Sequence, residues 1–274
     1  MSQARELNKA ELLSVLDWYR AAGVDLAVGE DPVDRFAQPA PAAAARAARP
    51  ASAAPAPAQA APAAPAPGAP TMADPGEARR LAASANSLPE LRSLLEAYDG
   101  CSLKFRATQL VFADGNPEAR IMLIGEAPGA DEDREGKPFS GRTGQLLDRM
   151  LAAIGLDRKS TYIVNAVPWR PPGNRATTPE EMELCLPFLH RHVELVAPRL
   201  VMTLGGPSMQ TIFKTNAGII KMRGRWQEVE IGSHRVDAVP TLHPADLLRN
   251  PAAKQQAWAD LLVLKMKMAE LGLS

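Results

Sequence analysis

The sequence has few cysteines, few aromatic residues and no excess charge of either sign. Two cysteines in 274 residues, Cys101 and Cys185, exclude a disulfide framework, so we expect a protein of the reducing cytoplasm. Lys+Arg and Asp+Glu both number 31, so no overall positive field marks a nucleic-acid-binding protein. No apolar run reaches the roughly 18 residues of a membrane-spanning helix, and acidic residues interrupt the first thirty positions. We therefore expect neither a membrane span nor a signal peptide.

Composition divides the chain into three parts. Residues 1–36 contain a short amphipathic pattern at 8–19, which predicts a helix. Residues 37–71 hold 19 Ala and 9 Pro, too much proline for a continuous helix and too little apolar bulk for a core, so we expect a disordered linker. Residues 72–274 show regular patterning and are expected to form the globular domain. From Cys101 onward Lys and Arg exceed Asp and Glu by three, which permits contact with nucleic acid without arguing for it.

Apolar strand patterns alternate with helical patterns through the globular part. Strands are expected at 120–125, 161–167, 200–205 and 236–242, and helices within 75–98 and at 143–154, 179–196, 208–213 and 254–271. Thr178 followed by Glu181 predicts a capping box for the third of these helices, and Pro240 places the last strand at a sheet edge or near its own end. The pattern indicates an α/β fold whose mostly parallel sheet is covered on both faces. Ligands of such sheets bind beyond the carboxyl ends of the strands.

The loop after the first strand carries an acidic cluster and an aromatic residue. Glu126, Asp131, Glu132 and Asp133 would repel a nucleotide triphosphate, and the phosphate-loop lysine is missing, so we exclude an NTPase. We expect Asp131 and Asp133 to be surface charges. Phe139 is either a core residue or a stacking platform for a planar ligand. A glycine-rich helix start that includes Arg142 could hold a phosphate.

The loops after two further strands hold polar groups suited to a ligand. Asn165 lies at an apolar strand end, where its amide needs partners, and it is followed by the basic, rigid stretch from Arg170 to Arg175. His243 precedes a proline, which restricts its direction. The nearby Leu247, Leu248 and Arg249 suggest an apolar wedge with a phosphate contact. By contrast, we interpret the histidines at 190, 192 and 234 as structural or surface residues.

These motifs in this order resemble the family-four bacterial uracil-DNA glycosylases, over residues 98–265. The matching strings are GEAPGADED, GKPF, GR.GQLL, the asparagine at 165, RPPGNR, C.PFL and HPA.LLR. The resemblance implies a three-layer α/β/α fold that hydrolyses the N-glycosidic bond of deoxyuridine in DNA. It assigns the uracil-contacting turn to Gly125, Glu126 and Ala127, base stacking to Phe139, recognition of the Watson–Crick edge to Asn165, and contact with O2 to His243.

The sequence departs from this family in its metal ligands. Family members usually bind a [4Fe–4S] cluster through four cysteines, whereas here Tyr98 and Trp169 stand in place of the first and third. Cys101 and Cys185 match the second and fourth, and two thiolates do not satisfy cluster ligation. We therefore expect no cluster, no metal site and no other cofactor, with aromatic packing in its place.

The mechanism that we expect involves a flipped nucleotide and no metal. His243 and Asn165 would stabilise the uracil anion, Glu126 or alternatively Glu132 would position water or stabilise the sugar cation, and a wedge from Leu247 or Leu248 would fill the gap in the DNA. Arg142, Arg170, Arg175 and Arg249 would hold phosphates. We expect a monomer that binds uracil-containing DNA and releases free uracil. The alternatives are a glycosylase of broader specificity for deaminated bases and a catalytically silent module that binds uracil-DNA or a repair partner; a covalent abasic-site trap is disfavoured because the loop after Trp169 lacks a histidine.

Overall fold

A six-stranded mixed sheet organises the computed structural model, which describes residues 74–273. The predicted helix at 8–19 and linker at 37–71 lie outside the described residues. The strands run in the order β1-β3-β2-β4-β6-β5, with the four central strands parallel and the two outer ones antiparallel to their neighbours. Their bounds are β1 Asp114–Gly115, β2 Ile121–Gly125, β3 Tyr162–Asn165, β4 Leu200–Leu204, β5 Gln227–Ile231 and β6 His234–Thr241.

Helices connect these strands and cover both faces of the sheet. The α-helices are α2 Pro75–Ser84, α3 Leu88–Ala97, α4 Ala130–Glu135, α5 Gly141–Ala152, α6 Pro179–Val196, α7 Gly206–Phe213, α8 Ile219–Met222, α9 Pro244–Arg249 and α10 Lys254–Glu270. Short 3-10 turns occur at Ser102–Phe105, Pro172–Asn174 and Pro251–Ala253. No helix within residues 74–273 is long and apolar enough to cross a membrane.

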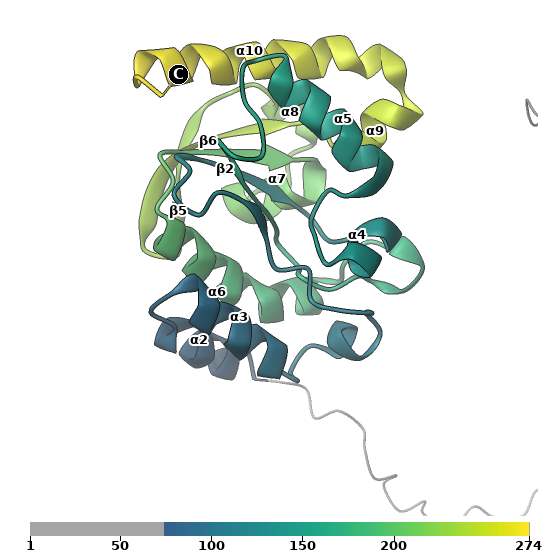
Figure 1. Cartoon of the computed structure of the whole chain (residues 1–274), viewed down its shortest axis with the longest axis vertical. Helices are drawn as coiled ribbons and strands as arrows, with labels where there is room; N and C mark the ends of the chain where they lie inside the picture. The colour runs from purple at the N-terminus through teal and green to yellow at the C-terminus, as the bar shows by residue number, and fades with distance from the viewer. Residues whose placement is uncertain (1–73, 274) are drawn as a thin grey trace, which may run out of the picture. The chain divides into compact units, whose positions relative to one another are not determined.

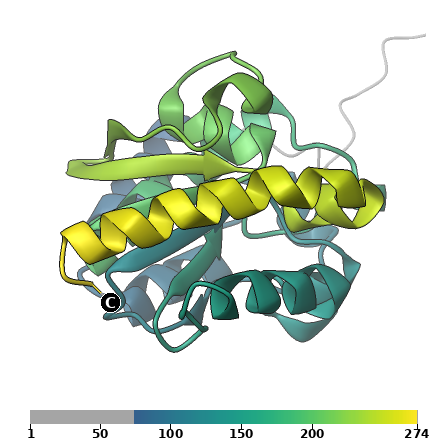
Figure 2. The ribbon, with the colours of Figure 1, turned by 90° about the horizontal axis from the view of Figure 1, so that it is seen from above.

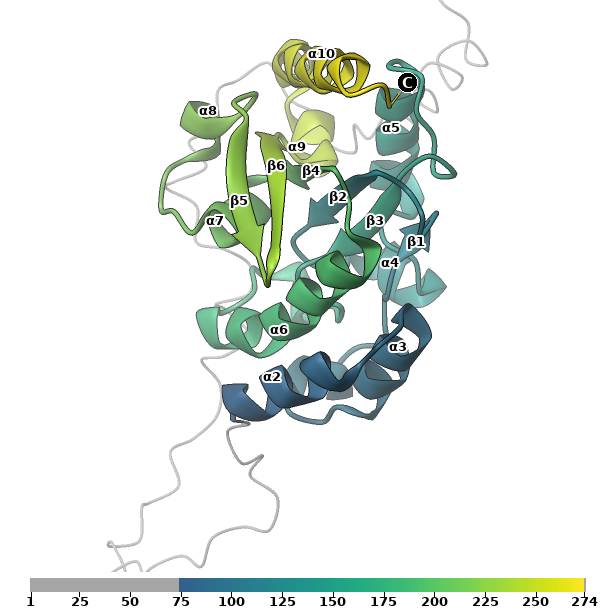
Figure 3. The same ribbon diagram turned by 90° about the vertical axis from the view of Figure 1, so that its left-hand side faces the viewer.

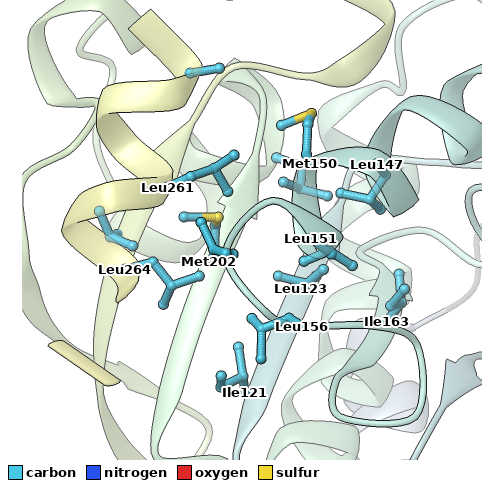
Figure 4. Packing of buried hydrophobic residues seen from close by; sticks show 14 of the residues in the cluster. Ile121, Leu123, Leu147, Met150, Leu151, Leu156, Ile163, Met202, Leu261 and Leu264 are labelled. Carbon is cyan, nitrogen blue, oxygen red and sulfur yellow. The ribbon is translucent and has the colours of Figure 1, made fainter. Parts of the chain in front are cut away.

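The core divides into two layers because side chains of a strand alternate between faces. Leu123 of β2 packs with α5, α9 and α10 on one face, while its neighbours Met122 and Ile124 pack with α6 and α7 on the other. Figure 4 shows the first of these layers, with Leu261 and Leu264 of α10 close to the strands. In Figure 2, α10 runs across the sheet, and it belongs to the same core layer as α5. This arrangement confirms the expected three-layer α/β/α fold.

Helices α2 and α3 form an additional layer outside α6. Both contact α6, and Figures 1 and 3 show them on the side of α6 that faces away from the sheet. Leu91 and Leu95 of α3 join α6 residues in a third buried cluster. The predicted helical region 75–98 is thus two helices, separated at Ala85–Ser87, where Ser87 caps the second.

The local signals in α6 and β6 have clear structural outcomes. The Thr178 side chain accepts a hydrogen bond from the Glu181 backbone N–H, and Glu181 reciprocates, so the capping box is confirmed. Strand β6 is flanked by β4 and β5, so Pro240 does not mark an edge strand. It is the penultimate residue of β6, so the expected alternative, a proline near the end of the strand, is confirmed. Proline has no N–H to donate to a neighbouring strand, and none is needed on the β5 side because β5 pairs only as far as Ala238. The Pro240 carbonyl accepts a hydrogen bond from the Gly224 N–H.

Candidate active site

The carboxyl ends of the four parallel strands open onto one cavity of about 630 Å³. The chain passes from β2 to β3 on one side and then to β4 on the other, so this edge includes a topological switch point, where ligands bind in open α/β sheets. The lining comes from the loops that follow β2, β3, β4 and β6. Its members include Glu126, Ala127, Asp131, Glu132, Phe139, Arg142, Thr143, Asn165, Arg175, Gly205, Gly206, Pro207, His243, Asp246 and Arg249.

Gly125, at the end of β2, is where an aromatic ring and an amide meet. A Cβ atom added to Gly125 would lie 2.3 Å from Asn165 Oδ1 and 2.8 Å from Phe139 Cζ. Only glycine leaves room for both groups, because real side chains do not approach a Cβ that closely. The strand register pairs Gly125 with Asn165, so β2 and β3 fix this arrangement directly. The structure therefore brings the predicted ring and amide together.

Phe139 lies at the boundary between the core and the cavity. It is 3% exposed and belongs to the α5–α10 core layer, yet it also lines the cavity. Its ring centroid lies 5.4 Å from that of His243, with the planes tilted by 34°. Phe139 is therefore a core residue, as one of the two interpretations predicts, whose ring also borders the cavity. Its role as a stacking platform stays a prediction.

The His243 imidazole has a defined tautomer. Its Nδ1 accepts a hydrogen bond of 3.1 Å from the Ala245 N–H, so in the neutral ring Nε2 carries the hydrogen. Burial lowers the pKa of His243 from 6.5 to about 4, so the ring is neutral at physiological pH. His243 is also the N-cap residue of α9, and Pro244 follows it as the first residue of that helix. The cap hydrogen bond and the proline together restrict the position of the ring. His243 thus offers the cavity one N–H donor.

The Asn165 side chain is 7% exposed and faces the cavity. Among the hydrogen bonds within residues 74–273, none involves this amide, and its polar atoms are not sealed in the core. A buried amide without a protein partner costs stability unless water or a ligand satisfies it. The side chain is therefore available to a ligand and is not a structural asparagine bonded to its neighbours.

Glu126 is held by a residue that the sequence did not single out. Its Oε1 accepts hydrogen bonds of 3.3 Å from both the N–H and the hydroxyl of Thr177. Thr177 belongs to the segment just before α6, far along the chain from Glu126. Nothing in the local sequence signals this pairing, because it depends on the meeting of two distant loops.

Of the two acids in the first loop that we expected to be surface charges, Asp131 and Asp133, one is buried. Asp133 is 4% exposed and accepts hydrogen bonds of 2.8 Å from both the N–H and the hydroxyl of Thr108, so its prediction as a surface charge is wrong. Asp131 pairs with Arg134 at the surface of α4. Glu132 is buried, and burial raises its pKa although Thr143 and the Gly129 N–H donate to it.

The predicted phosphate-binding arginines fall into two groups. Arg142 and Arg249 are exposed at the cavity, and Arg249 also bonds to Asp246. Arg175 lines the cavity but donates to both carboxylate oxygens of Glu181, at 2.8 and 2.5 Å. Arg170 lies outside the lining and donates to Asn174 at 2.7 Å.

The predicted wedge is wrong for Leu247. Helix α9 turns this side chain into the core, where it is 1% exposed and packs in the α5–α10 layer. A residue in that position cannot enter a DNA duplex without unfolding the helix. Leu248 points partly outward and packs only at the margin of the same layer.

The four positions that correspond to cluster cysteines meet in the core between α3 and α6. Tyr98, Cys101, Trp169 and Cys185 all belong to one buried hydrophobic cluster with Phe188. The two sulfur atoms lie 3.9 Å apart, and the Tyr98 ring lies 5.1 Å from that of Phe188. Burial, together with the two thiols, raises the pKa of Tyr98 to about 12, so its hydroxyl stays neutral.

This donor set does not fit an iron–sulfur cluster. Two thiols remain where four thiolates are needed, and the Trp169 and Tyr98 side chains fill the space beside them. Across residues 74–273, no group of three or more His, Cys, Asp or Glu side chains is arranged to hold a metal ion.

Comparison with known proteins gives a consistent family assignment. Residues 112–262 match the model of the uracil DNA glycosylase superfamily. The chain is 40% identical over 164 residues to the type-4 uracil-DNA glycosylase of Archaeoglobus fulgidus, covering 58% of this chain and 82% of that protein. It is 39% identical over 154 residues to the type-4 uracil-DNA glycosylase of Thermotoga maritima, covering 55% and 77%. A type-5 uracil-DNA glycosylase of Pyrobaculum aerophilum is 31% identical over 148 residues, 48% of this chain and 64% of that protein. The chain therefore belongs to the uracil DNA glycosylase superfamily.

Proposed function

We propose that this protein is a monofunctional uracil-DNA glycosylase, which hydrolyses the N-glycosidic bond of deoxyuridine in DNA. The observation that carries the proposal is that Phe139, Asn165 and His243 line one cavity at the switch point of the sheet. A phenyl ring, an amide and an N–H donor are the groups needed to stack on uracil and to read its edge. The products are free uracil and an abasic site, as in the first step of base excision repair.

Uracil recognition rests on Asn165. Its amide oxygen accepts from uracil N3–H while its NH₂ group donates to O4. In this orientation the amide mismatches cytosine, which has an acceptor at N3 and an amine at C4. Phe139 stacks on the ring, and the Gly125 turn lets the backbone approach it closely. Because the base must leave the duplex to reach this cavity, the enzyme acts on a flipped nucleotide.

Bond cleavage leaves negative charge on the departing base and positive charge on the sugar. The negative charge spreads over O2, N1 and O4 of uracil. The neutral His243 ring donates through Nε2 to O2, and Asn165 donates to O4. Both hydrogen bonds become stronger as negative charge develops on the base. Neither group has to change its protonation state for this role.

Glu126 is our candidate for the group that acts on the sugar side. Thr177 holds Oε1, and Glu126 lines the cavity, so the other carboxylate oxygen is our candidate to contact water or the oxocarbenium ion. Glu132 is the second candidate, but its raised pKa and its bonds to Gly129 and Thr143 suit a structural role better.

DNA binding would use exposed arginines beside the cavity. Arg142 is the strongest candidate for a phosphate contact, because it is exposed at the cavity and no hydrogen bond or ion pair of its side chain is found within residues 74–273. Arg249 is also exposed at the cavity but pairs with Asp246, Arg175 is engaged by Glu181, and Arg170 by Asn174. With Leu247 in the core, only Leu248 remains as a candidate wedge. We propose that the protein acts as a monomer on uracil-containing DNA.

We further propose that the protein folds and works without an iron–sulfur cluster. The support is the buried packing of Tyr98 and Trp169 around two thiols. Purified protein should contain far less than stoichiometric iron and lack visible absorption. The double variant Tyr98→Cys with Trp169→Cys would restore four thiolates, and after anaerobic reconstitution it should gain iron and colour. Stoichiometric iron in the unaltered protein would contradict the proposal.

The activity is tested with an end-labelled oligonucleotide that carries one uracil. Alkali-labile nicks at that position, absent for a thymine oligonucleotide, are expected. Binding without nicks would favour the alternative of a silent module. Nicks at hypoxanthine or xanthine as well as uracil would favour a glycosylase of broader specificity.

A further inference from the structure

The Arg158 guanidinium contacts the backbone of the loop that carries Phe139. Its Nη2 donates to the Phe139 carbonyl at 2.5 Å, and its Nη1 donates to the Pro138 carbonyl at 3.2 Å. Arg158 comes from the loop between α5 and β3 and is not among the residues that line the cavity. It therefore contacts the Phe139 backbone without lining the cavity itself.

The Phe139 backbone needs such support. Its φ of 52° is in the left-handed region, which a bulky residue occupies only when its surroundings compensate the strain. The carbonyl also passes over Gly144, where an added Cβ would lie 1.6 Å from the oxygen. Gly144 gives the carbonyl room, and Arg158 supplies its hydrogen-bond donor.

Arg158 is itself fixed by two carboxylates from different elements. Its Nη1 lies 2.5 Å from Asp114 of β1, and its Nε lies 2.8 Å from Asp148 of α5. A planar guanidinium with partners along three directions has little freedom to rotate. The loop containing Phe139 is thus linked through one side chain to the sheet edge and to α5.

We propose that Arg158 is a positioning residue of the active site, which acts on uracil through the orientation of Phe139. Arg158 holds the left-handed turn at Phe139 so that the ring lies over Gly125 and next to Asn165. This role rests on the proposed function, since the ring matters only if a planar base binds against it. Lysine at this position keeps a positive charge between Asp114 and Asp148 but cannot reproduce the fork of hydrogen bonds.

The test compares Arg158→Lys and Arg158→Gln with the control Arg149→Gln, which removes an exposed arginine of the neighbouring α5. We expect the single-turnover rate of uracil excision to fall about 10- to 100-fold in both Arg158 variants, as for displacement of a reacting group by about 1 Å. DNA affinity should stay unchanged, because Arg158 is not among the residues that line the cavity, whereas Arg142 and Arg249 are. The control should match the unaltered enzyme in both measurements.

A double-mutant cycle separates positioning from general stability. In the Phe139→Leu background, the ring that Arg158 is proposed to orient is gone, so Arg158→Lys should cause little further loss of rate. If the two losses instead multiply, Arg158 does not act through Phe139 and the proposal is wrong. Melting temperatures of all variants show which of them fold.

Hydrogen exchange tests the same link without any activity. Peptides covering residues 139–144 should exchange faster in Arg158→Gln than in Arg149→Gln. Equal exchange in the two variants would overturn the proposal. An unaltered protein that fails to excise uracil would refute the proposed function alone, while faster exchange in Arg158→Gln would still support the contact with the Phe139 loop.

Discussion

Replacing Asn165 by aspartate removes the amide NH₂ group that we propose donates to uracil O4, and it leaves the size of the side chain almost unchanged. The lost hydrogen bond in a site that is 7% exposed costs about 1–3 kcal/mol. Unit charges 4 Å apart repel by about 4 kcal/mol at an effective dielectric constant of 20. Since O4 carries only part of the departing charge, the carboxylate adds roughly 1–2 kcal/mol. The sum of about 2–5 kcal/mol predicts a loss of about 30- to 5,000-fold in the rate of excision.

Single-turnover kinetics on a uracil oligonucleotide measures this loss, with enzyme in excess over DNA. Asn116→Asp is the matched control, because Asn116 lies near the amino end of β3 and its Oδ1 only accepts, from the Glu118 N–H at 3.0 Å. Aspartate preserves that bond, so the control should keep full activity. A rate for Asn165→Asp within threefold of the unaltered enzyme, with both proteins folded, would refute the assigned role of the amide.

The remaining predictions concern three other residues. His243→Ala should slow excision by about 10²–10³-fold, the usual loss for one donor to developing charge, and an unchanged single-turnover rate would contradict it. In the unaltered enzyme the rate should show no histidine step near pH 6.5, because burial lowers the pKa of His243 to about 4. The rate should fall as the pH approaches about 4, because protonation of Nδ1 breaks its hydrogen bond from the Ala245 N–H and so releases the ring from its position. The unfolded state binds this proton first, so the free energy of unfolding, followed by urea titration, should fall as the pH drops from about 6.5 toward 4. Gly125→Ala should abolish excision while the protein stays folded, since the new methyl group occupies the space of the ring and the amide; retained activity would contradict the close approach. Leu247→Ala should lower the free energy of unfolding by about 2–5 kcal/mol, whereas a stable variant with weakened DNA binding would restore the wedge hypothesis.

The elements with strong local signals were predictable from the sequence. Helix α6 begins and ends where the pattern placed it, because Thr178, Pro179 and Glu181 specify its start independently of the rest of the fold. The central strand β2 is an uninterrupted buried run, so its apolar residues identify it without knowledge of its neighbours. The position of the cavity was predictable from these strands, because the carboxyl ends of parallel strands meet at one edge of the sheet.

The parts that the sequence did not reveal depend on tertiary contacts. Strand β5, with the sequence QEVEI, is a mostly exposed antiparallel edge strand and carries too few apolar residues to be recognised. The burial of Asp133 depends on Thr108, which lies 25 residues earlier in the chain. Leu247 and Leu248 are adjacent and alike, and only the packing of α9 decides which of them enters the core. Short-range patterns contain none of this information.

A crystal structure of the protein with free uracil tests the central claim most directly. We predict that the base stacks on Phe139, exchanges two hydrogen bonds with the Asn165 amide and accepts one from His243 Nε2. Uracil bound elsewhere, or bound in this cavity with the Asn165 amide and the His243 ring directed away from it, would contradict the account.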